Sequence, residues 1–160
     1  MNKLNYFGIG PKIGIISIPW FAVMVIISSI YKDLFVYTTG NRNLLLIVGI
    51  ILLTFGLIYY FLTIRILLKG LKDTVLIKKG AFRYCQNPLY ANFILLLFPS
   101  LSFILNSWLV LTSSLVSYIL FKIYIRDEYK ELEKFFGEEY LKYKRETPEF
   151  FPFILRKKSP

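Results

Sequence analysis

Residues 84–121 read YCQNPLYANFILLLFPSLSFILNSWLVLTSSLVSYILF and contain no charged side chain. A single α-helix of this length would be about 57 Å long, whereas the hydrocarbon core of a bilayer is about 30 Å thick. The stretch is therefore predicted to cross a membrane, turn at Asn106 and Ser107, and cross back. Such a hairpin would bring the polar residues at its two ends to the same membrane face.

Two more uncharged runs, residues 13–31 and 43–64, are each long enough to span a bilayer. A cleaved signal peptide is the alternative for the first run, which lacks a short apolar region followed by a small-residue cleavage site. The sequence predicts an all-α, polytopic membrane protein that forms a single domain over residues 1–160. The expected transmembrane helices are about four, at residues 13–31, 43–64, 88–105 and 108–126.

The basic residues predict the orientation. With four spans, all but two of the 20 Lys and Arg residues would lie on one side of the membrane, and only Lys32 and Arg42 on the other. Basic residues gather on the cytoplasmic side of membrane proteins. Both termini and both polar clusters are therefore expected in the cytoplasm. Topology and contacts with anionic lipid headgroups account for the net charge of +10, so no nucleic-acid partner is expected.

Beyond residue 126 the sequence becomes charged but keeps a helical stripe of apolar residues. The spacing predicts a cytoplasmic amphipathic helix, interrupted at Gly137, within a C-terminal segment of residues 127–160. Residues 74–77 could form a short strand in the loop before the hairpin. The stripe consists of Tyr129, Leu132, Phe136, Tyr140 and Tyr143.

Several kinds of chemistry are disfavoured. The chain has no histidine and one cysteine, Cys85, so neither an internal disulfide nor a Cys/His metal site is expected. Its glycines do not form a dinucleotide-binding pattern. The residues alone leave two interpretations open for the clusters around Asn87 and Glu128: helix caps and interfacial anchors, or a polar site at the cytoplasmic membrane face.

Three motifs are more informative together than singly. Residues 80–90, GAFRYCQNPLY, resemble the G-x-Y-R-Y-x-R-H-P-x-Y segment of the isoprenylcysteine carboxyl methyltransferase family, which groups with the phospholipid methyltransferases. Residues 128–143 resemble that family's E-E-x-x-L…F-G-x-x-Y-x-x-Y segment. Residues 144–152 are similar to its closing R-x-V-P-R-x-I-P. The resemblance covers about residues 71–152, with the hairpin between the first two motifs.

The resemblance implies methyl transfer from S-adenosyl-L-methionine to a membrane lipid or a prenylated acceptor. No catalytic residue is assigned, because in-line transfer to an acceptor such as a carboxylate needs only correct positioning. The C-terminal segment would complete the cofactor pocket, in which tyrosine faces could hold the sulfonium cation and Glu128 its polar groups. The residues carried over as cofactor-binding are Arg83, Gln86, Asn87, Pro88, Leu89, Tyr90, Glu128, Tyr140, Tyr143 and Arg145.

The chain departs from the family pattern at three places. The Arg-His dipeptide is Gln86-Asn87, the second glutamate is Tyr129, and the late arginine is Glu149. These departures motivate an alternative, a non-catalytic member of the same fold that binds a lipid or a partner. A further alternative is a related nicotinamide-dependent reductase of lipids or sterols. The expected location is an integral membrane protein of the inner or plasma membrane if bacterial, or of the endoplasmic reticulum if eukaryotic.

Overall fold

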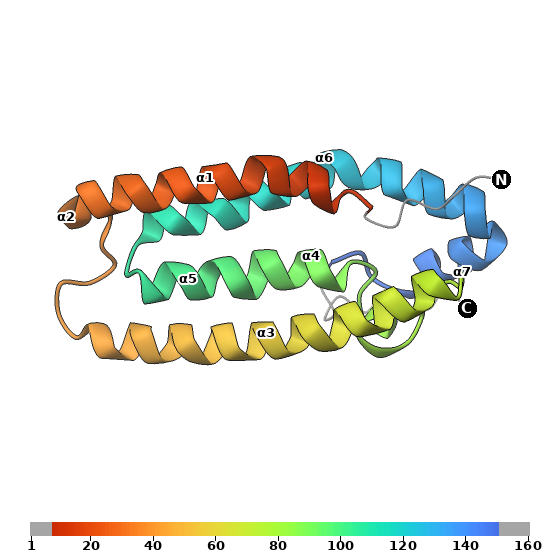
Figure 1. Cartoon of the computed structure of the whole chain (residues 1–160), viewed down its shortest axis with the longest axis horizontal. Coiled ribbons are helices and arrows are strands. Elements are labelled where there is room, and N and C mark those ends of the chain that lie inside the picture. The colour runs from red at the N-terminus through yellow and green to blue at the C-terminus, as the bar shows by residue number, and fades with distance from the viewer. Residues whose placement is uncertain (1–7, 151–160) are drawn as a thin grey trace.

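The computed structural model describes residues 8–150 (Figure 1). Three of its helices are long and apolar enough to cross a membrane: α1 (Gly10–Ile30), α3 (Arg42–Lys72) and α6 (Trp108–Phe136). The short elements are α2 (Lys32–Phe35), the 3₁₀ turn η1 (Gly80–Arg83) and α7 (Glu138–Glu146). The predicted all-α membrane class is confirmed.

The predicted hairpin is built from α6 and a shorter apolar stretch, Pro88–Ile104. That stretch comprises α4 (Pro88–Asn92), a π-helical turn η2 (Phe93–Leu97) and α5 (Phe98–Ile104). It ends at the predicted turn, where Asn106 has a positive φ of 51° and Ser107 precedes α6. Its 17 residues would span about 26 Å, slightly less than a typical hydrocarbon core. Four crossings therefore remain a prediction.

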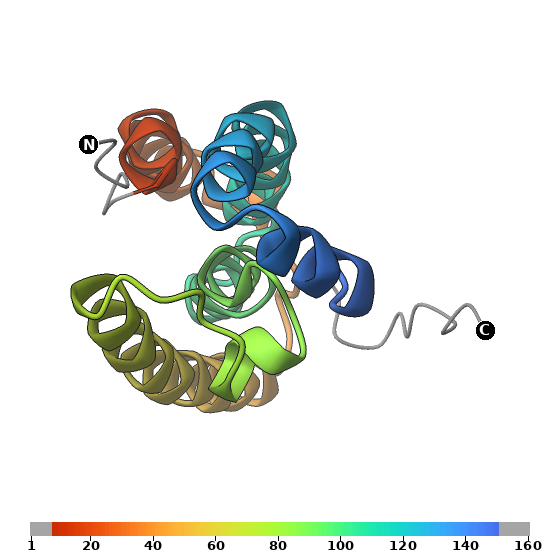
Figure 2. The same cartoon turned by 90° about the vertical axis from the view of Figure 1, so that its right-hand side faces the viewer.

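The helices pair antiparallel around the Pro88–Ile104 stretch. Helix α1 packs on α6, α3 packs on α5, and α5 also contacts α6. Viewed along the bundle, α4 and α5 lie between the α1–α6 pair and α3 (Figure 2). Where α1 meets α6, the Ser17 and Ser117 hydroxyls are 2.8 Å apart and buried. Small polar residues of this kind let membrane helices approach closely.

The face of α3 that packs on this stretch carries a small residue every seven positions. Gly49, Gly56, Thr63 and Gly70 are all buried, and seven residues make almost two helical turns. A Cβ added at Gly56 would lie 2.8 Å from the end of the Leu97 side chain, which would have to shift to make room for it. The buried Asn92 amide donates a hydrogen bond to the Gly56 carbonyl at 3.1 Å.

The C-terminal region differs in part from expectation. Helix α6 continues past residue 126 to Phe136, so the first half of the apolar stripe extends the last long helix. The predicted interruption at Gly137 is confirmed, with a positive φ of 54° there, and α7 follows. The predicted strand at 74–77 is wrong: Thr74 has a φ of 55° and the following residues are irregular. Residues 151–160 of the predicted C-terminal segment lie outside the described range.

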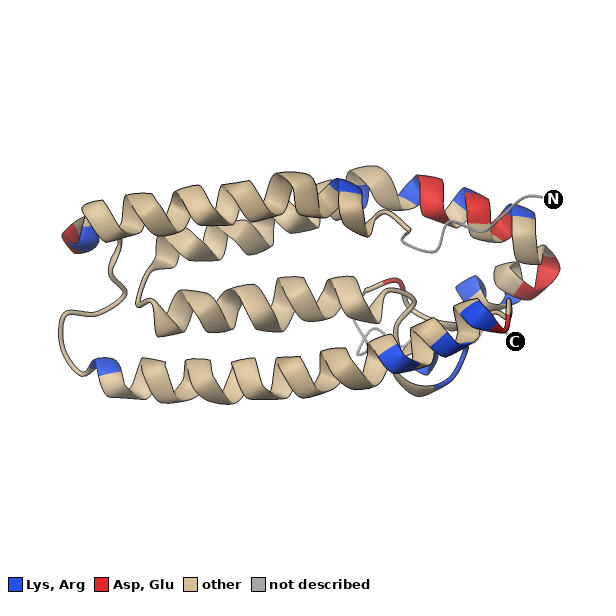
Figure 3. Cartoon of the chain, viewed as in Figure 1, with Lys and Arg blue, Asp and Glu red and all other residues tan. Residues whose placement is uncertain are grey.

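Charged side chains concentrate at one end of the bundle (Figure 3). That end contains the start of α1, the loop after α3, the last turns of α6, and α7 (Figure 1). In the described range the opposite end has Lys32, Asp33 and Arg42 as its charged residues. This separation brings the two polar clusters to one end of the bundle, as the hairpin predicts, while the cytoplasmic assignment remains a prediction.

Candidate functional site

The candidate site lies where three parts of the chain meet at the charged end of the bundle. These are the turn before α4, the part of α6 beyond its uncharged stretch, and residues 144–150, hereafter the closing segment. Pro88 begins α4, where its missing N–H breaks no helical hydrogen bond. Asn87 occupies the N-cap position, but its side chain makes no capping bond, contrary to the sequence-based expectation. The amide is instead available to the site.

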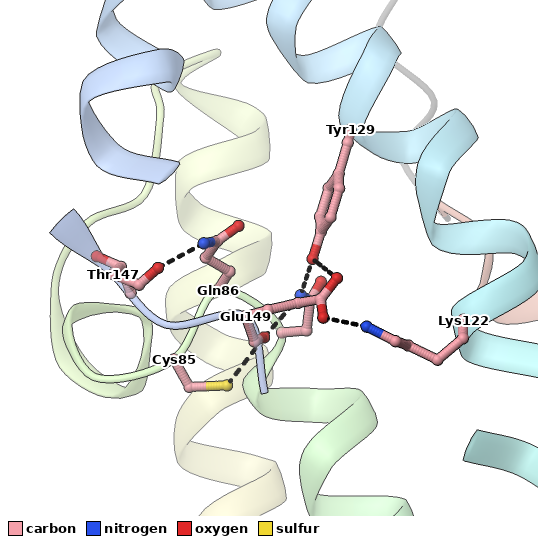
Figure 4. Close-up of polar contacts among 7 residues, drawn as sticks. Cys85, Gln86, Lys122, Tyr129, Thr147 and Glu149 are labelled. Carbon is pink, nitrogen blue, oxygen red and sulfur yellow. Dashed lines mark hydrogen bonds and ion pairs between the residues drawn. The ribbon is translucent and has the colours of Figure 1, made fainter. Parts of the chain in front are cut away.

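The Asn87 side chain is buried and joins the site's three parts. Figure 4 shows the neighbouring contacts of Glu149 with Tyr129 and Lys122. Its Nδ2 donates to the Tyr129 hydroxyl at 2.6 Å and to the Glu149 carbonyl at 2.9 Å. The Tyr129 hydroxyl in turn donates to the Glu149 carboxylate at 3.2 Å. The other carboxylate oxygen forms an ion pair with Lys122. One continuous chain of polar contacts thus runs from α4 through the closing segment to α6.

The closing segment lies directly over Cys85 and Gln86. The Gln86 backbone N–H donates to the Pro148 carbonyl at 2.9 Å, and its side-chain amide donates to the carbonyls of Lys144 and Thr147. The buried Cys85 thiol donates to the Phe150 carbonyl at 3.3 Å. Burial raises the pKa of this thiol to about 11, and the Glu149 carboxylate adds to the shift. Cys85 is therefore protonated at neutral pH.

A second group of contacts surrounds Glu128. Its Oε2 accepts hydrogen bonds from the Ile9 backbone N–H at 3.0 Å and from the Tyr90 hydroxyl at 3.1 Å. A Cβ at Gly8 would be 2.5 Å from the same oxygen, so the chain before α1 fits tightly against this carboxylate. Burial raises the pKa of the Glu128 carboxyl, and the two hydrogen bonds oppose the shift. Glu128 thereby holds the start of α1 against α4 and α6.

Three tyrosine rings fill the space between α6 and α7. The Tyr140 ring centroid is 6.3 Å from that of Tyr129 and 6.5 Å from that of Tyr143. The Tyr143 hydroxyl donates to the Phe82 carbonyl at 2.6 Å. Within residues 8–150, the buried Tyr140 hydroxyl and the Gln86 side-chain oxygen have no hydrogen-bond partner. Buried polar atoms are normally satisfied, so both could bind a ligand.

The remaining predicted residues lie at the margin of this cluster. Arg83 is exposed, with its guanidinium 5.9 Å from the centroid of the neighbouring Tyr84 ring, and Arg145 is exposed on α7. Leu89 is half-buried in α4. Among the described contacts, neither arginine has a hydrogen bond or an ion pair with Asn87 or Glu128. Their proposed role in cofactor binding stays a prediction.

Sequence reasoning missed the roles of Lys122 and Glu149. Glu149 was recognised only as a departure from the family pattern, and Lys122 only as the end of an uncharged stretch. The sequence contains one signal, a negative charge at Glu149 where the family has a positive one, but this signal does not identify Lys122 as the partner. Its ion pair with Lys122 accommodates that reversal.

Two cavities elsewhere in the bundle are lined by none of the predicted cofactor residues. One lies at the charged end of α3 and the other at the opposite end of the molecule, between α1, α3 and the hairpin turn. In the described structure the closing segment covers the side-chain amides of Gln86 and Asn87, hereafter the amide pair. A ligand that contacts both amide side chains would have to displace or rearrange this segment.

A comparison with protein families covers two of the three parts of this site, the turn before α4 and the described part of α6 up to residue 134. The model of the isoprenylcysteine carboxyl methyltransferase (ICMT) family matches residues 43–134, more than half of the chain. The match begins in α3 and includes both the amide pair and Glu128, but ends before Gly137. Neither the curated proteins nor the solved structures give a match. On the strength of the family match, this chain belongs to the isoprenylcysteine carboxyl methyltransferase family.

Proposed function

We propose that the protein is an S-adenosyl-L-methionine-dependent methyltransferase that methylates a carboxylate on a lipid-like or prenylated acceptor at the cytoplasmic membrane face. Membership of the family implies a membrane methyltransferase. The observation that carries the proposal is the family match over residues 43–134, and the 2.6 Å hydrogen bond between Asn87 and Tyr129 brings the two motif halves together. These residues are 42 positions apart in the sequence.

The chemistry of the site's atoms fits the cofactor. Aromatic faces attract a sulfonium cation, and Tyr129, Tyr140 and Tyr143 provide three rings in one cluster. The Lys144 ammonium lies 5.1 Å from the Tyr129 ring centroid and 5.9 Å from that of Tyr140, so a bound sulfonium would have to displace it from these two rings. The unpartnered Tyr140 hydroxyl can donate to a carboxylate, and the unpartnered Gln86 oxygen can accept from an amino or hydroxyl group. The cofactor supplies an activated methyl group. Asn87, Glu128, Tyr90, Arg83 and Arg145 are proposed as further contacts.

A carboxylate acceptor suits the titratable groups at this site. A carboxylate is ionised at neutral pH and needs no general base, whereas a protonated amine must first lose a proton. Burial raises the pKa of the Tyr140 and Tyr143 hydroxyls, so both stay neutral and are poor bases. The protein's contribution would be to align the acceptor with the methyl group and to exclude water, for which the closing segment is well placed.

The neutral side chains of Gln86 and Asn87, which stand where the family has an arginine and a histidine, predict weak cofactor binding. Hydrogen bonds to charged groups contribute about 1.5–3 kcal/mol and neutral ones about 0.5–1.5 kcal/mol, so each replaced charge would lower affinity about tenfold. Gln86 and Asn87 also already donate to carbonyls of the closing segment. We therefore expect binding that is measurable by calorimetry at millimolar cofactor. Absence of binding at that concentration would remove the proposed function.

Variants of Glu128 test its role in binding. We expect Glu128→Ala to weaken cofactor binding about tenfold or more, since a charge-assisted contact is lost. Glu131→Ala is the matched control, because Glu131 is exposed on the same helix and should leave binding unchanged. Calorimetry on the purified full chain provides the measurement.

Glu128→Gln separates binding from a structural role. It keeps an oxygen that can accept from the Ile9 N–H and removes the charge. If Glu128 only anchors α1, the glutamine variant should bind cofactor like the unmodified protein. If the carboxylate contacts the cofactor, the glutamine variant should keep the thermal stability of the unmodified protein. It should nevertheless bind the cofactor more weakly than the unmodified protein does, as Glu128→Ala is expected to.

A non-catalytic member of the family is the second candidate. One observation favours it. The side-chain amides of Gln86 and Asn87 already donate hydrogen bonds to backbone carbonyls of the closing segment, where a cofactor would otherwise accept them. Incorporation of labelled methyl groups into membrane lipids distinguishes the two functions. Incorporation that depends on this protein would exclude the non-catalytic role, whereas cofactor binding without any transfer would favour it.

A further inference from the structure

A cavity outside the candidate site opens beside the charged end of α3. Its volume is about 500 Å³, and α3 and the loop that follows it form its walls. The loop folds back along the helix: a Cβ at Gly70 would lie 2.2 Å from the Ile77 side chain, and one at Gly80 would lie 2.5 Å from Ile66. These close contacts give the cavity a defined shape.

The polar lining of the cavity has an excess of positive charge. It contains Arg65, Lys69, Lys78 and Lys79 against one acidic residue, Asp73. Lys78 forms an ion pair with Glu139 of α7 at 2.6 Å. No ion pair or hydrogen bond of the other three basic side chains is found among residues 8–150. A cationic ligand would be repelled here, whereas an anion would compensate the excess charge.

The predicted span of α3 places the cavity at the depth of lipid headgroups. Arg65 directly follows the uncharged residues 43–64, a helical length of about 33 Å that matches a hydrocarbon core. Lys69 is one turn further along α3. The floor of the cavity is apolar, with Ile66, Val75 and Ile77 among its lining residues. A ligand at this position would therefore meet basic groups and hydrocarbon together.

The surface below the cavity is also apolar. Ile58 and Leu62 precede Ile66 at intervals of four residues, so the three share one face of α3. The side chains of Ile58 and Leu62 are 55% and 56% exposed. An acyl chain could follow this face into the membrane while its headgroup stays among the basic residues.

We propose that this cavity binds the phosphate headgroup of an anionic glycerophospholipid, with an acyl chain along α3. The proposal is independent of methyl transfer, because the cavity shares no residue with the candidate cofactor site. Arg65 and Lys69 would contact the phosphate from α3, and Lys79 from the loop. Bound lipid would fix the loop that leads to η1 and the amide pair.

The test uses the full chain in nanodiscs of phosphatidylcholine and phosphatidylglycerol in equal parts. Native mass spectrometry then measures which lipid remains bound. We expect phosphatidylglycerol to be retained preferentially, and Arg65→Gln/Lys69→Gln to reduce that preference about fivefold for each side chain removed. Lys130→Gln/Lys134→Gln is the matched control, since it removes the same charge from exposed positions on α6 and should preserve the preference.

Two outcomes would overturn the proposal. One is an equal loss of the preference for phosphatidylglycerol in both double variants. That result would indicate that the preference depends on general surface charge and not on this cavity. The other is displacement of the lipid by NADPH but not by glycerol phosphate, which would assign the cavity to a soluble nucleotide instead of a lipid headgroup. If the α3 double variant unfolds in phosphatidylcholine alone, Lys79→Gln in the exposed loop replaces it. A Lys79→Gln protein with unchanged lipid preference would then count against the site.

Discussion

Replacing Gly49 by alanine destabilises the bundle by about 1–3 kcal/mol, the usual cost of overpacking a well-packed contact. An added Cβ would lie 2.8 Å from the Ile104 side chain and 3.0 Å from the Ser100 carbonyl oxygen. The Ile104 backbone nitrogen is only 3.1 Å away. Because two of these atoms belong to the backbone of α5, a rotamer change cannot relieve the contact. Thermal unfolding of the protein in detergent measures the loss.

Gly14→Ala is the matched control within the same bundle. Its Cβ would have ordinary contact with Ile18 at 3.8 Å, and alanine favours a helix over glycine by about 1 kcal/mol. This variant should be as stable as the unmodified protein or more so. Equal unfolding temperatures for the two variants would mean that α3 and α5 do not pack as closely as the structure shows.

The contact at Gly49 illustrates what the sequence could not predict. The uncharged runs predicted two single spans and the hairpin, because the hydrophobic thickness of a bilayer sets the length of a span. Among the described residues, the structure has three helices long enough to cross and a shorter fourth stretch. Small residues seven positions apart determine which face of α3 packs on α5. The other faces of α3 are also apolar, so the sequence does not distinguish this face from them. With lipid and neighbouring helices equally apolar, periodicity of hydrophobicity gives no signal for that face.

The C-terminal half shows a different limit. The stripe from Tyr129 to Tyr143 and its break at Gly137 were predictable, since spacing and a glycine mark them. The extension of α6 to Phe136 was not, because the change from apolar to charged residues at position 126 marks a solvent boundary rather than a helix end. Helical hydrogen bonds continue across such a boundary without interruption.

At the candidate site, sequence motifs identified the segments that meet but not their contacts. Asn87 was expected to cap α4, as asparagine commonly does. Tertiary contacts with Tyr129 and Glu149 engage the same amide instead. The Lys122–Glu149 ion pair was also beyond prediction, because it joins residues 27 positions apart on separate elements. Local patterns do not encode such a pairing.

Cys85 offers a direct measure of whether the closing segment moves. It is the only cysteine, it is 3% exposed, and its pKa is raised to about 11. An ordinary thiol has a pKa of about 8.5, so the raised pKa of Cys85 lowers its thiolate fraction at neutral pH by about a hundredfold or more. We expect Cys85 to react with a maleimide at least about a hundredfold more slowly than a free thiol, followed by mass spectrometry.

Loosening the closing segment should speed this reaction. Glu149→Ala removes the carboxylate that contacts Tyr129 and Lys122, and loss of one charged hydrogen bond of about 1.5 kcal/mol would raise the open population about tenfold. Because the same carboxylate helps to raise the pKa of Cys85, each labelling rate is divided by the thiolate fraction, which the pH dependence of labelling gives. Glu146→Ala is the control, because Glu146 is exposed on the same stretch of chain. Equal labelling rates in the two variants would show that the Glu149 carboxylate does not hold the segment closed. If cofactor binds beneath the segment, adding it should change the Cys85 rate in the unmodified protein, which links this motion to the proposed site.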